Sequence, residues 1–276
     1  MEVMDFLLLL FEKGEEVVLK GGRVLRFEVL TDIGRKRTVN EDCAAVFTIK
    51  DGPTLAIIAD GMGGHRGGDY ASSTAVQILG EKFLKVENPK SLEEEDWKEL
   101  LQEMILYVNR TLFNIAEKDE NFKGMGTTLD AVLIYGNKGL VTHVGDSRVY
   151  MIDEREILQI TKDHSFVNIL LDSGEITEEE AAKHPQRNWI MRAVGSEKFI
   201  TPDFYNIELN GQTYLLICTD GLSNKVDNER IHRIVATDGD LRDKAMELIR
   251  LANEMGGEDN ISVILAGPSA SEVSQQ

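Results

Sequence analysis

Two apolar runs in this chain end in the same way, and this repeated ending strongly constrains the fold. The run "LAIIA" at 55–59 is followed by Asp60 and Gly61, and "LLICT" at 215–219 is followed by Asp220 and Gly221. Short apolar runs bounded by turn residues predict buried strands. One Asp-Gly pair is ordinary turn chemistry. Two strands that both end in a carboxylate, 160 residues apart, indicate a shared site.

The size and charge of the chain exclude several classes of protein. Its 276 residues suffice for one large domain with a sizeable core. A net charge of −18 argues against binding of nucleic acid, and bound cations would neutralise part of that charge. Cys43 and Cys218 are not spaced for a disulfide framework or a zinc site.

The N-terminal residues include one short apolar run, "FLLLLF" at 6–11. It is far shorter than the roughly 20 residues that cross a bilayer. Glu2 and Asp5 stand where a signal peptide carries positive charge. We therefore expect a cytoplasmic protein without membrane insertion. Residues 1–26 are predicted to be an N-terminal extension that either pairs as extra strands around a Gly-Gly turn or contacts a partner, and strand pairing is favoured.

The order of strand and helix patterns predicts an α+β fold. Regular βαβ alternation is missing from the sequence, so we expect mostly antiparallel sheets with helices packed outside them. Helical periodicity is found at 69–83, at 91–118 with a capping box of Ser91 and Glu94, at 228–236 and at 241–255. Strands are expected at 43–49, 54–59, 129–135, 139–145, 147–152, 156–161, 204–209, 213–218 and 261–267.

The segment 161–195 is too polar and too broken to be core. It has short helical patterns near 166–171 and 178–183, and Thr177 and Glu180 form a capping box before the second. We expect an inserted surface flap. The main domain is predicted to span residues 27–266, followed by a disordered tail at 267–276.

Several acidic residues stand at the junctions between strands and turns, beside glycine or other small residues. Small neighbours let the backbone approach a ligand closely. An unpaired carboxylate next to an apolar strand is costly to desolvate, and too few lysines and arginines lie nearby in the sequence to pair them all. Hard divalent cations with oxygen ligands would compensate these acids. The acids are Glu41, Asp42, Asp60, Asp146, Asp220 and Asp259.

The stretches that carry these acids resemble, in order, the motif series of the bacterial metal-dependent phosphatases of the protein phosphatase 2C family. They are "RTVNEDCA", "ADGMGGHRGGDYAS", "GMGTTL", "HVGDSRVY", "TKDHSFVNILLDSGEI", "HPQRNWIMRAVG", "CTDGLSNKV" and "GGEDNISVIL". The resemblance covers residues 27–266. It implies an αββα sandwich of two antiparallel sheets flanked by pairs of helices, and hydrolysis of phosphoserine and phosphothreonine in proteins.

The same resemblance implies a metal cofactor. Asp60 is similar to the family's carboxylate that bridges two ions, and the carbonyl of Gly61 would bind one of them. Asp220 and Asp259 would bind the other. Mn²⁺ or Mg²⁺ suits an all-oxygen site of this kind, and a pair of such ions can activate a water for attack on phosphorus.

Further residues match the surroundings of that site. Asp146, with Asp220, resembles the third metal site of bacterial members. Glu41 and Asp42 resemble acids that hold waters around the ions. Arg37 matches the arginine that binds the substrate phosphate, for which a planar guanidinium is well suited. The implied partners are phosphorylated proteins, among them a Hanks-type Ser/Thr kinase and its substrates, and the implied state is a monomer.

One residue departs from the family pattern in animal members, where a histidine proposed as the general acid follows the first Asp-Gly. Here that residue is Met62. The leaving group could take its proton from a water at the metals or leave as a stabilised alkoxide, and the residues do not decide between the two. Among the histidines, His143 is predicted to be structural because it lies in a strand. His164 and His184 bracket the flap, where substrate handling is one role open to them.

Two alternatives from other functional classes remain. A catalytically inactive scaffold or sensor on the same fold is disfavoured, since every metal-ligand position of the motif series is intact. A two-metal nuclease is disfavoured by the charge of −18 and by the lack of a basic groove pattern.

Overall fold

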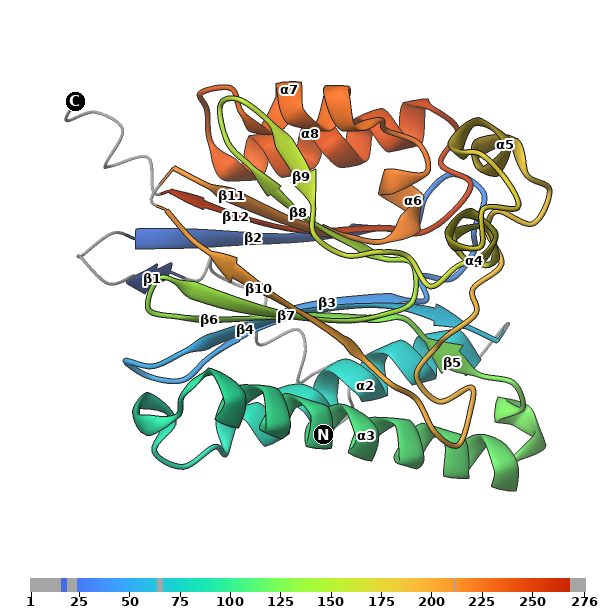
Figure 1. Cartoon of the computed structure of the whole chain (residues 1–276), viewed down its shortest axis with the longest axis horizontal. Coiled ribbons are helices and arrows are strands. Elements are labelled where there is room, and N and C mark those ends of the chain that lie inside the picture. Colours follow the sequence, from blue (N-terminus) through green and yellow to red (C-terminus); the bar gives the residue numbers. More distant parts are fainter. Residues whose placement is uncertain (1–15, 19–23, 64–66, 211, 269–276) are drawn as a thin grey trace.

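The computed structural model describes residues 16–18, 24–63, 67–210 and 212–268. Two sheets lie face to face, and helices cover both outer faces (Figure 1). Every strand pair in the two sheets is antiparallel. The predicted α+β sandwich of two antiparallel sheets is therefore confirmed.

The first sheet, which we call sheet A, has six strands in the order β1-β2-β12-β11-β8-β9. In that order they are Glu16–Val18, Val24–Asp32, Ile261–Pro268, Tyr214–Cys218, Arg148–Ile152 and Ile157–Gln159. The second, sheet B, has the order β10-β7-β6-β4-β3, and β5 pairs with β4. Its strands are Asp203–Glu208, Lys138–Val144, Leu129–Tyr135, Thr54–Met62 and Asp42–Thr48, with β5 at Gly126–Thr127.

Different helices cover the outer faces of the two sheets (Figure 1). The helices α2 (Gly67–Leu84) and α3 (Glu94–Lys118) pack on sheet B, and α7 (Asn228–Val235) and α8 (Leu241–Glu254) pack on sheet A. Between β9 and β10 the chain forms α4 (Phe166–Asp172) and α5 (Glu178–Lys183), close to the patterns predicted for the flap. Two 3₁₀ helices, Pro89–Ser91 and Glu120–Phe122, flank α3. No helix in the described part of the chain has the length and apolar character to span a bilayer.

The apolar residues form three layers, and strand β4 contributes to two of them. Leu55, Ile57 and Ala59 face α2 and α3, whereas Ala56 and Ile58 face sheet A. Because both faces of the strand are buried, its sequence is a continuous apolar run instead of an alternating one. Full burial of one such leucine or isoleucine contributes about 1.5–3 kcal/mol, so β4 is a rigid support for the acid at its end.

Two sequence predictions need correction at element boundaries. The cap of α3 is Glu93, whose backbone N–H donates to Asp96 Oδ2 at 2.8 Å, and not Ser91. Ser91 belongs to the preceding 3₁₀ helix, where its hydroxyl donates to the carbonyl of Asn88 at 2.8 Å. The boundary predicted after residue 26 falls inside β2, which pairs with β1 on one side and β12 on the other.

The capping box before α5 is confirmed. Thr177 Oγ1 accepts from the backbone N–H of Glu180 at 3.3 Å, and Glu180 Oε2 accepts from the N–H of Thr177 at 2.8 Å. The Gly-Gly turn of the extension and the tail after residue 268 lie outside the described residues.

Candidate active site

The acids singled out from the sequence come from both sheets and meet at one end of the sandwich. Asp60 ends the apolar part of β4 in sheet B, and Asp42 begins β3 directly opposite it in register. From sheet A, Asp220 is the first residue of a short helix, α6 (Asp220–Ser223), and Asp259 lies just before β12. Asp146 stands in the turn between β7 and β8. In Figure 1, α6 lies beside α4 and α5, so the flap covers this end of the sheets.

Both Asp-Gly pairs need glycine because of close packing against a neighbouring backbone. A Cβ on Gly61 would overlap the carbonyl of Gly68 at the start of α2. A Cβ on Gly221 would overlap the carbonyl of Asn260 beside Asp259. Gly61 therefore lets the start of α2 approach the end of β4, and Gly221 lets the loop that carries Asp259 approach Asp220.

The acids raise one another's pKa. The pKa of Asp60 lies well above its usual range, first because of desolvation and then because of the charges of Asp42 and Asp220. Desolvation also raises the pKa of Asp42 to about 7, although hydrogen bonds from Ser262 and Thr219 lower it. A cluster of this kind is stable only when it holds protons or a bound cation.

Two further acids of the cluster behave in the same way. Desolvation and the charge of Asp259 raise the pKa of Asp220 to about 6, although a hydrogen bond from Asp60 lowers it. The pKa of Asp146 is raised well above its ordinary value by desolvation and then by the charge of Asp220. Within the described part of the chain, Asp60, Asp146 and Asp220 form no ion pair with a basic side chain.

Unused oxygens in this cluster fit a hard cation. Oδ1 atoms of Asp42, Asp146 and Asp220 are buried and accept no hydrogen bond from any described residue. An unpaired buried acceptor costs about 1–3 kcal/mol, and more when it is charged. Carboxylate oxygens are the donors that Mg²⁺ and Mn²⁺ prefer, so the chemistry of these unused acceptors suits a divalent metal.

One predicted ligand already binds other groups of the chain. Asp259 Oδ2 accepts from Arg37 Nη2 at 2.8 Å, and its Oδ1 accepts from the N–H of Asn260 at 2.8 Å. Among the described residues, no group of three or more His, Cys, Asp and Glu side chains has the arrangement of a metal site. The structure thus brings the predicted acids together but leaves Asp259 bound to Arg37.

Arg37 lies at the open edge of the cluster. Its side chain is 45% exposed, with Nη1 at 3.9 Å from Glu41 Oε2 and Nε donating to the carbonyl of Glu258 at 3.4 Å. The backbone of Glu41 is anchored, because its N–H donates to Asn260 Oδ1 at 2.8 Å and its carbonyl accepts from Ser72 Oγ at 2.6 Å. A guanidinium at this position is accessible to a ligand from solvent.

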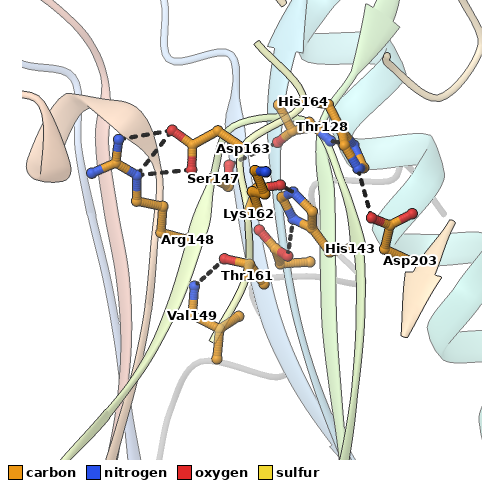
Figure 2. Close-up of polar contacts among 12 residues, drawn as sticks. Thr128, His143, Ser147, Arg148, Val149, Thr161, Lys162, Asp163, His164 and Asp203 are labelled. Carbon is orange, nitrogen blue, oxygen red and sulfur yellow. Dashed lines mark hydrogen bonds and ion pairs between the residues drawn. The ribbon is translucent and has the colours of Figure 1, made fainter. Parts of the chain in front are cut away.

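Two supporting residues were not assigned a role from the sequence. The amide of Asn260 donates to the carbonyls of Ile33 and Val39, both at 3.0 Å, so it holds the loop that carries Arg37. Thr128 Oγ1 accepts from the N–H of Asp60 at 2.9 Å and contacts Ser147 Oγ at 2.8 Å (Figure 2). Both lie inside stretches that match the family motifs, but their sequence contains no signal of these long-range partners.

The flap forms the second wall of a cleft beside the acids. A cavity of about 480 Å³ is lined by Asp146 and Asp220 on one side and by Asn168, Leu171 and Arg187 of the flap on the other. Clefts of about 300–1,000 Å³ are typical of ligand sites. The cleft is therefore large enough for a phosphorylated side chain and part of its backbone.

The histidines differ in their surroundings. His143 is fully buried and its Nδ1 lies 2.7 Å from Asp130 Oδ1, which agrees with a structural role (Figure 2). His164, where the chain enters the flap, contacts the turn of Asp146. His184 ends α5, and its Nδ1 accepts from the N–H of Gln186 at 3.1 Å. Met62, in the place of the family's histidine, is half-buried at the end of β4 and has no proton to donate.

Comparison with known proteins gives consistent results. A sequence model of the family described as "Protein phosphatase 2C" matches residues 33–265. Protein phosphatase PhpP of Streptococcus pneumoniae is 41% identical over 241 residues, which are 87% of this chain and 96% of that protein. The solved structure of the serine/threonine phosphatase of S. agalactiae has a TM-score of 0.84 and 38% identity, and the match covers 89% of this chain and all of that one.

A further solved structure bears on the metal. The catalytic domain of the serine/threonine protein phosphatase PstP, in complex with two manganese ions, is similar to this chain with a TM-score of 0.75 and 34% identity. The match covers 88% of this chain and 98% of that one.

Proposed function

This chain belongs to the protein phosphatase 2C family and is a serine/threonine protein phosphatase, and we propose that its acid cluster binds two Mn²⁺ or Mg²⁺ ions for catalysis. The observation that carries this proposal is the set of buried, unpartnered carboxylate oxygens on Asp42, Asp146 and Asp220. The two manganese ions in the related PstP structure support the choice of metal.

Each acid has a role in this proposal. Asp60, the carbonyl of Gly61, Asp220 and Asp259 would hold the two ions. The support is that the charge of Asp220 raises the pKa of Asp60, and that these two acids stand at the ends of strands from different sheets. When bound, a pair of divalent ions supplies an activated water at neutral pH and neutralises charge on the phosphoryl group. Asp146 contributes to a third ion site together with Asp220.

The outer acids and the arginine complete the site. Glu41 and Asp42 hold waters around the ions, and Thr219 supports Asp42 by donating to its Oδ2 at 2.9 Å. Arg37 binds the substrate phosphate. Its guanidinium donates to Asp259 through Nη2, and other donors of this exposed side chain are open to the phosphate oxygens.

The proposed substrates are phosphoserine and phosphothreonine residues of proteins, among them a Hanks-type Ser/Thr kinase and the targets of that kinase. Support comes from the relatives named as protein or serine/threonine phosphatases. The cleft between the acids and the flap, with a volume of about 480 Å³, can accept a phosphorylated side chain. We propose that the enzyme works in the cytoplasm as a monomer and does not bind nucleic acid.

The experiment that tests this function measures hydrolysis of para-nitrophenyl phosphate and of a phosphothreonine peptide, with and without Mn²⁺. We expect metal-dependent release of phosphate from both, and about two tightly bound ions per chain by metal analysis. Absence of metal-dependent hydrolysis would support the scaffold alternative. Cleavage of DNA or RNA under the same conditions would support the nuclease alternative.

A further inference from the structure

The turn that carries Asp146 is held by one residue from the entrance of the flap. The backbone N–H of His164 donates to the carbonyl of Gly145 at 2.7 Å. In return, the Nδ1 atom of His164 accepts from the N–H of Gly145 at 3.1 Å. Both polar groups of the Gly145 backbone therefore bind His164, one peptide unit before Asp146.

This geometry determines the tautomer of the imidazole. Because the N–H of Gly145 can only donate, Nδ1 must be unprotonated, and the ring proton of neutral His164 is on Nε2. Nε2 faces Asp203 Oδ2 at 3.2 Å, an acceptor for that proton (Figure 2). Desolvation and the neighbouring His143 lower the pKa of His164 to about 4, so the ring is neutral at physiological pH.

Asp203 is itself held by the far end of the flap. Arg192, where the chain leaves the flap, donates from Nη1 to Asp203 Oδ1 at 2.9 Å and to the carbonyl of Thr201 at 2.8 Å. The same Nη1 lies 2.9 Å from His164 Nε2, and because a guanidinium can only donate, this contact competes with the hydrogen bond from Nε2–H to Asp203. The acceptor for the Nε2 proton is therefore Asp203, which Arg192 holds in place through Oδ1.

Packing restricts the His164 ring further. Only 10% of its side chain is exposed, and the ring lies on that of His143 with 4.6 Å between the centroids. His143 is bound by Asp130 on one side and contacts the carbonyl of Lys162 at 3.1 Å on the other. The N–H of Met191 donates to the carbonyl of His164 at 2.7 Å, which joins the backbone at the start of the flap to the segment near its end.

We propose that His164 is a positioning residue that orients Asp146 through the Gly145 peptide, with Asp203 accepting the Nε2 proton of the tautomer that this contact requires. Asp146 has an unpartnered buried Oδ1, so a rotation of the turn would move a free acceptor directly. The inference rests on the proposed third ion site of Asp146. Supporting residues around metal ligands commonly change metal affinity by about 10–100-fold.

The test compares His164→Gln with His164→Asn. The amide oxygen of asparagine can take the place of Nδ1, whereas that of glutamine takes the place of Nε2. Binding of Mn²⁺ is measured by electron paramagnetic resonance of the free ion, without substrate. We expect His164→Gln to bind the weakest ion about 10–100-fold less tightly, with the two tight ions unchanged. His164→Asn should stay within about threefold of the unsubstituted enzyme, because the acceptor for Gly145 is kept.

A second readout needs no metal. Nitrogen NMR of the imidazole in the metal-free enzyme should show His164 protonated on Nε2 only, and Asp203→Ala should produce a mixture of tautomers. A proton on Nδ1 in the unsubstituted enzyme would overturn the inference. So would equal weakening of Mn²⁺ binding in both His164 variants, or unchanged binding in His164→Gln.

The variant Asp146→Ala tests the third ion site separately from the positioning role of His164. If Asp146→Ala loses an ion and His164→Gln does not, the role of His164 is wrong while the third site stands. If Asp146→Ala binds as many ions as the unsubstituted enzyme, the third site is wrong and the inference fails with it. Thermal melting of each metal-free variant shows that the compared proteins are folded.

Discussion

Two groups of buried acids lie close together in this enzyme, and they are compensated differently. Asp130 is fully buried opposite His143, which binds it at 2.7 Å, and Asp163 is bound by the guanidinium of Arg148 at 2.7 Å (Figure 2). Asp60 and Asp220, in contrast, are surrounded by other carboxylates. A buried acid with a basic partner supplied by the chain supports the structure, whereas one without such a partner indicates a site for an external cation.

The pKa values express the same difference. Desolvation raises the pKa of Asp130, but the neighbouring His143 counteracts it. For Asp60 the neighbouring charges add to desolvation in the same direction. The comparison therefore predicts opposite changes in the stability of the metal-free enzyme when one carboxylate of each group is neutralised.

The largest effect is expected for Asp60 or Asp220. Asp60→Ala or Asp220→Ala should lower kcat for the phosphothreonine peptide by at least about 10⁴-fold, or about 5 kcal/mol of transition-state stabilisation, because each removes a shared ligand. The isosteric Asp60→Asn should raise the melting temperature of the metal-free enzyme, since it removes repulsion from Asp42 opposite. A fall in that melting temperature would contradict the distinction between the two groups.

Asp130→Asn should show the opposite behaviour in stability. Removing one partner of a buried pair leaves the other uncompensated, at a cost of about 3–5 kcal/mol in the free energy of unfolding. Denaturant unfolding without metal measures this loss. As a control, the double variant Asp130→Asn with His143→Gln should lose less unfolding free energy than the sum of the losses in the two single variants. Strict additivity would mean that the pair is not coupled.

The pH dependence of stability should reveal the acids that have no basic partner. In the folded metal-free enzyme the pKa of Asp42 is about 7 and that of Asp220 about 6, against an ordinary value of 3.8. The folded state therefore binds protons that the unfolded chain has released. The contribution of these two groups to stability should be greatest near pH 4 and fall as the pH rises through about 7, by about 1.4 kcal/mol per pH unit for each proton. Saturating Mn²⁺ should flatten this slope, and Asp42→Asn should reduce it.

The smallest effect is expected at the exposed edge of the cluster. Arg37→Ala should raise KM for the phosphopeptide by about tenfold with a smaller change in kcat, because a phosphate contact is lost. Arg37→Lys should recover only part of the lost affinity for the phosphopeptide, since an ammonium cannot bind two phosphate oxygens at once as a guanidinium does. An unchanged KM would remove Arg37 from the phosphate site.

Much of the fold follows from local patterns in the sequence. The continuous apolar run before Asp60 indicated a strand buried on both faces, and α3 was recognisable from helical spacing over its length. Its first residue was predicted less well. Ser91 and Glu94 have capping-box spacing, but Pro89 starts a 3₁₀ turn that uses the hydroxyl of Ser91. Competing local contacts of this kind decide a boundary without altering the element.

The acids of the site were also found from the sequence, because an Asp-Gly pair after a buried strand is a local signal. The partners of these acids were not. Arg37 binds Asp259 across 222 positions of the chain, and His164 reaches the turn of Asp146 through Gly145.

The sequence by itself determined which residues form strands, which acids end them, and that these acids exceed the local supply of basic side chains. Only the tertiary structure decided that Asp42 stands opposite Asp60, that Asp259 is bound to Arg37, and that His164 holds the peptide before Asp146. The physical reason is the distance along the chain over which each kind of interaction acts. Strand and helix patterns reflect neighbours within a few residues, whereas pairing of side chains depends on strand register and on the packing of segments far apart in the chain.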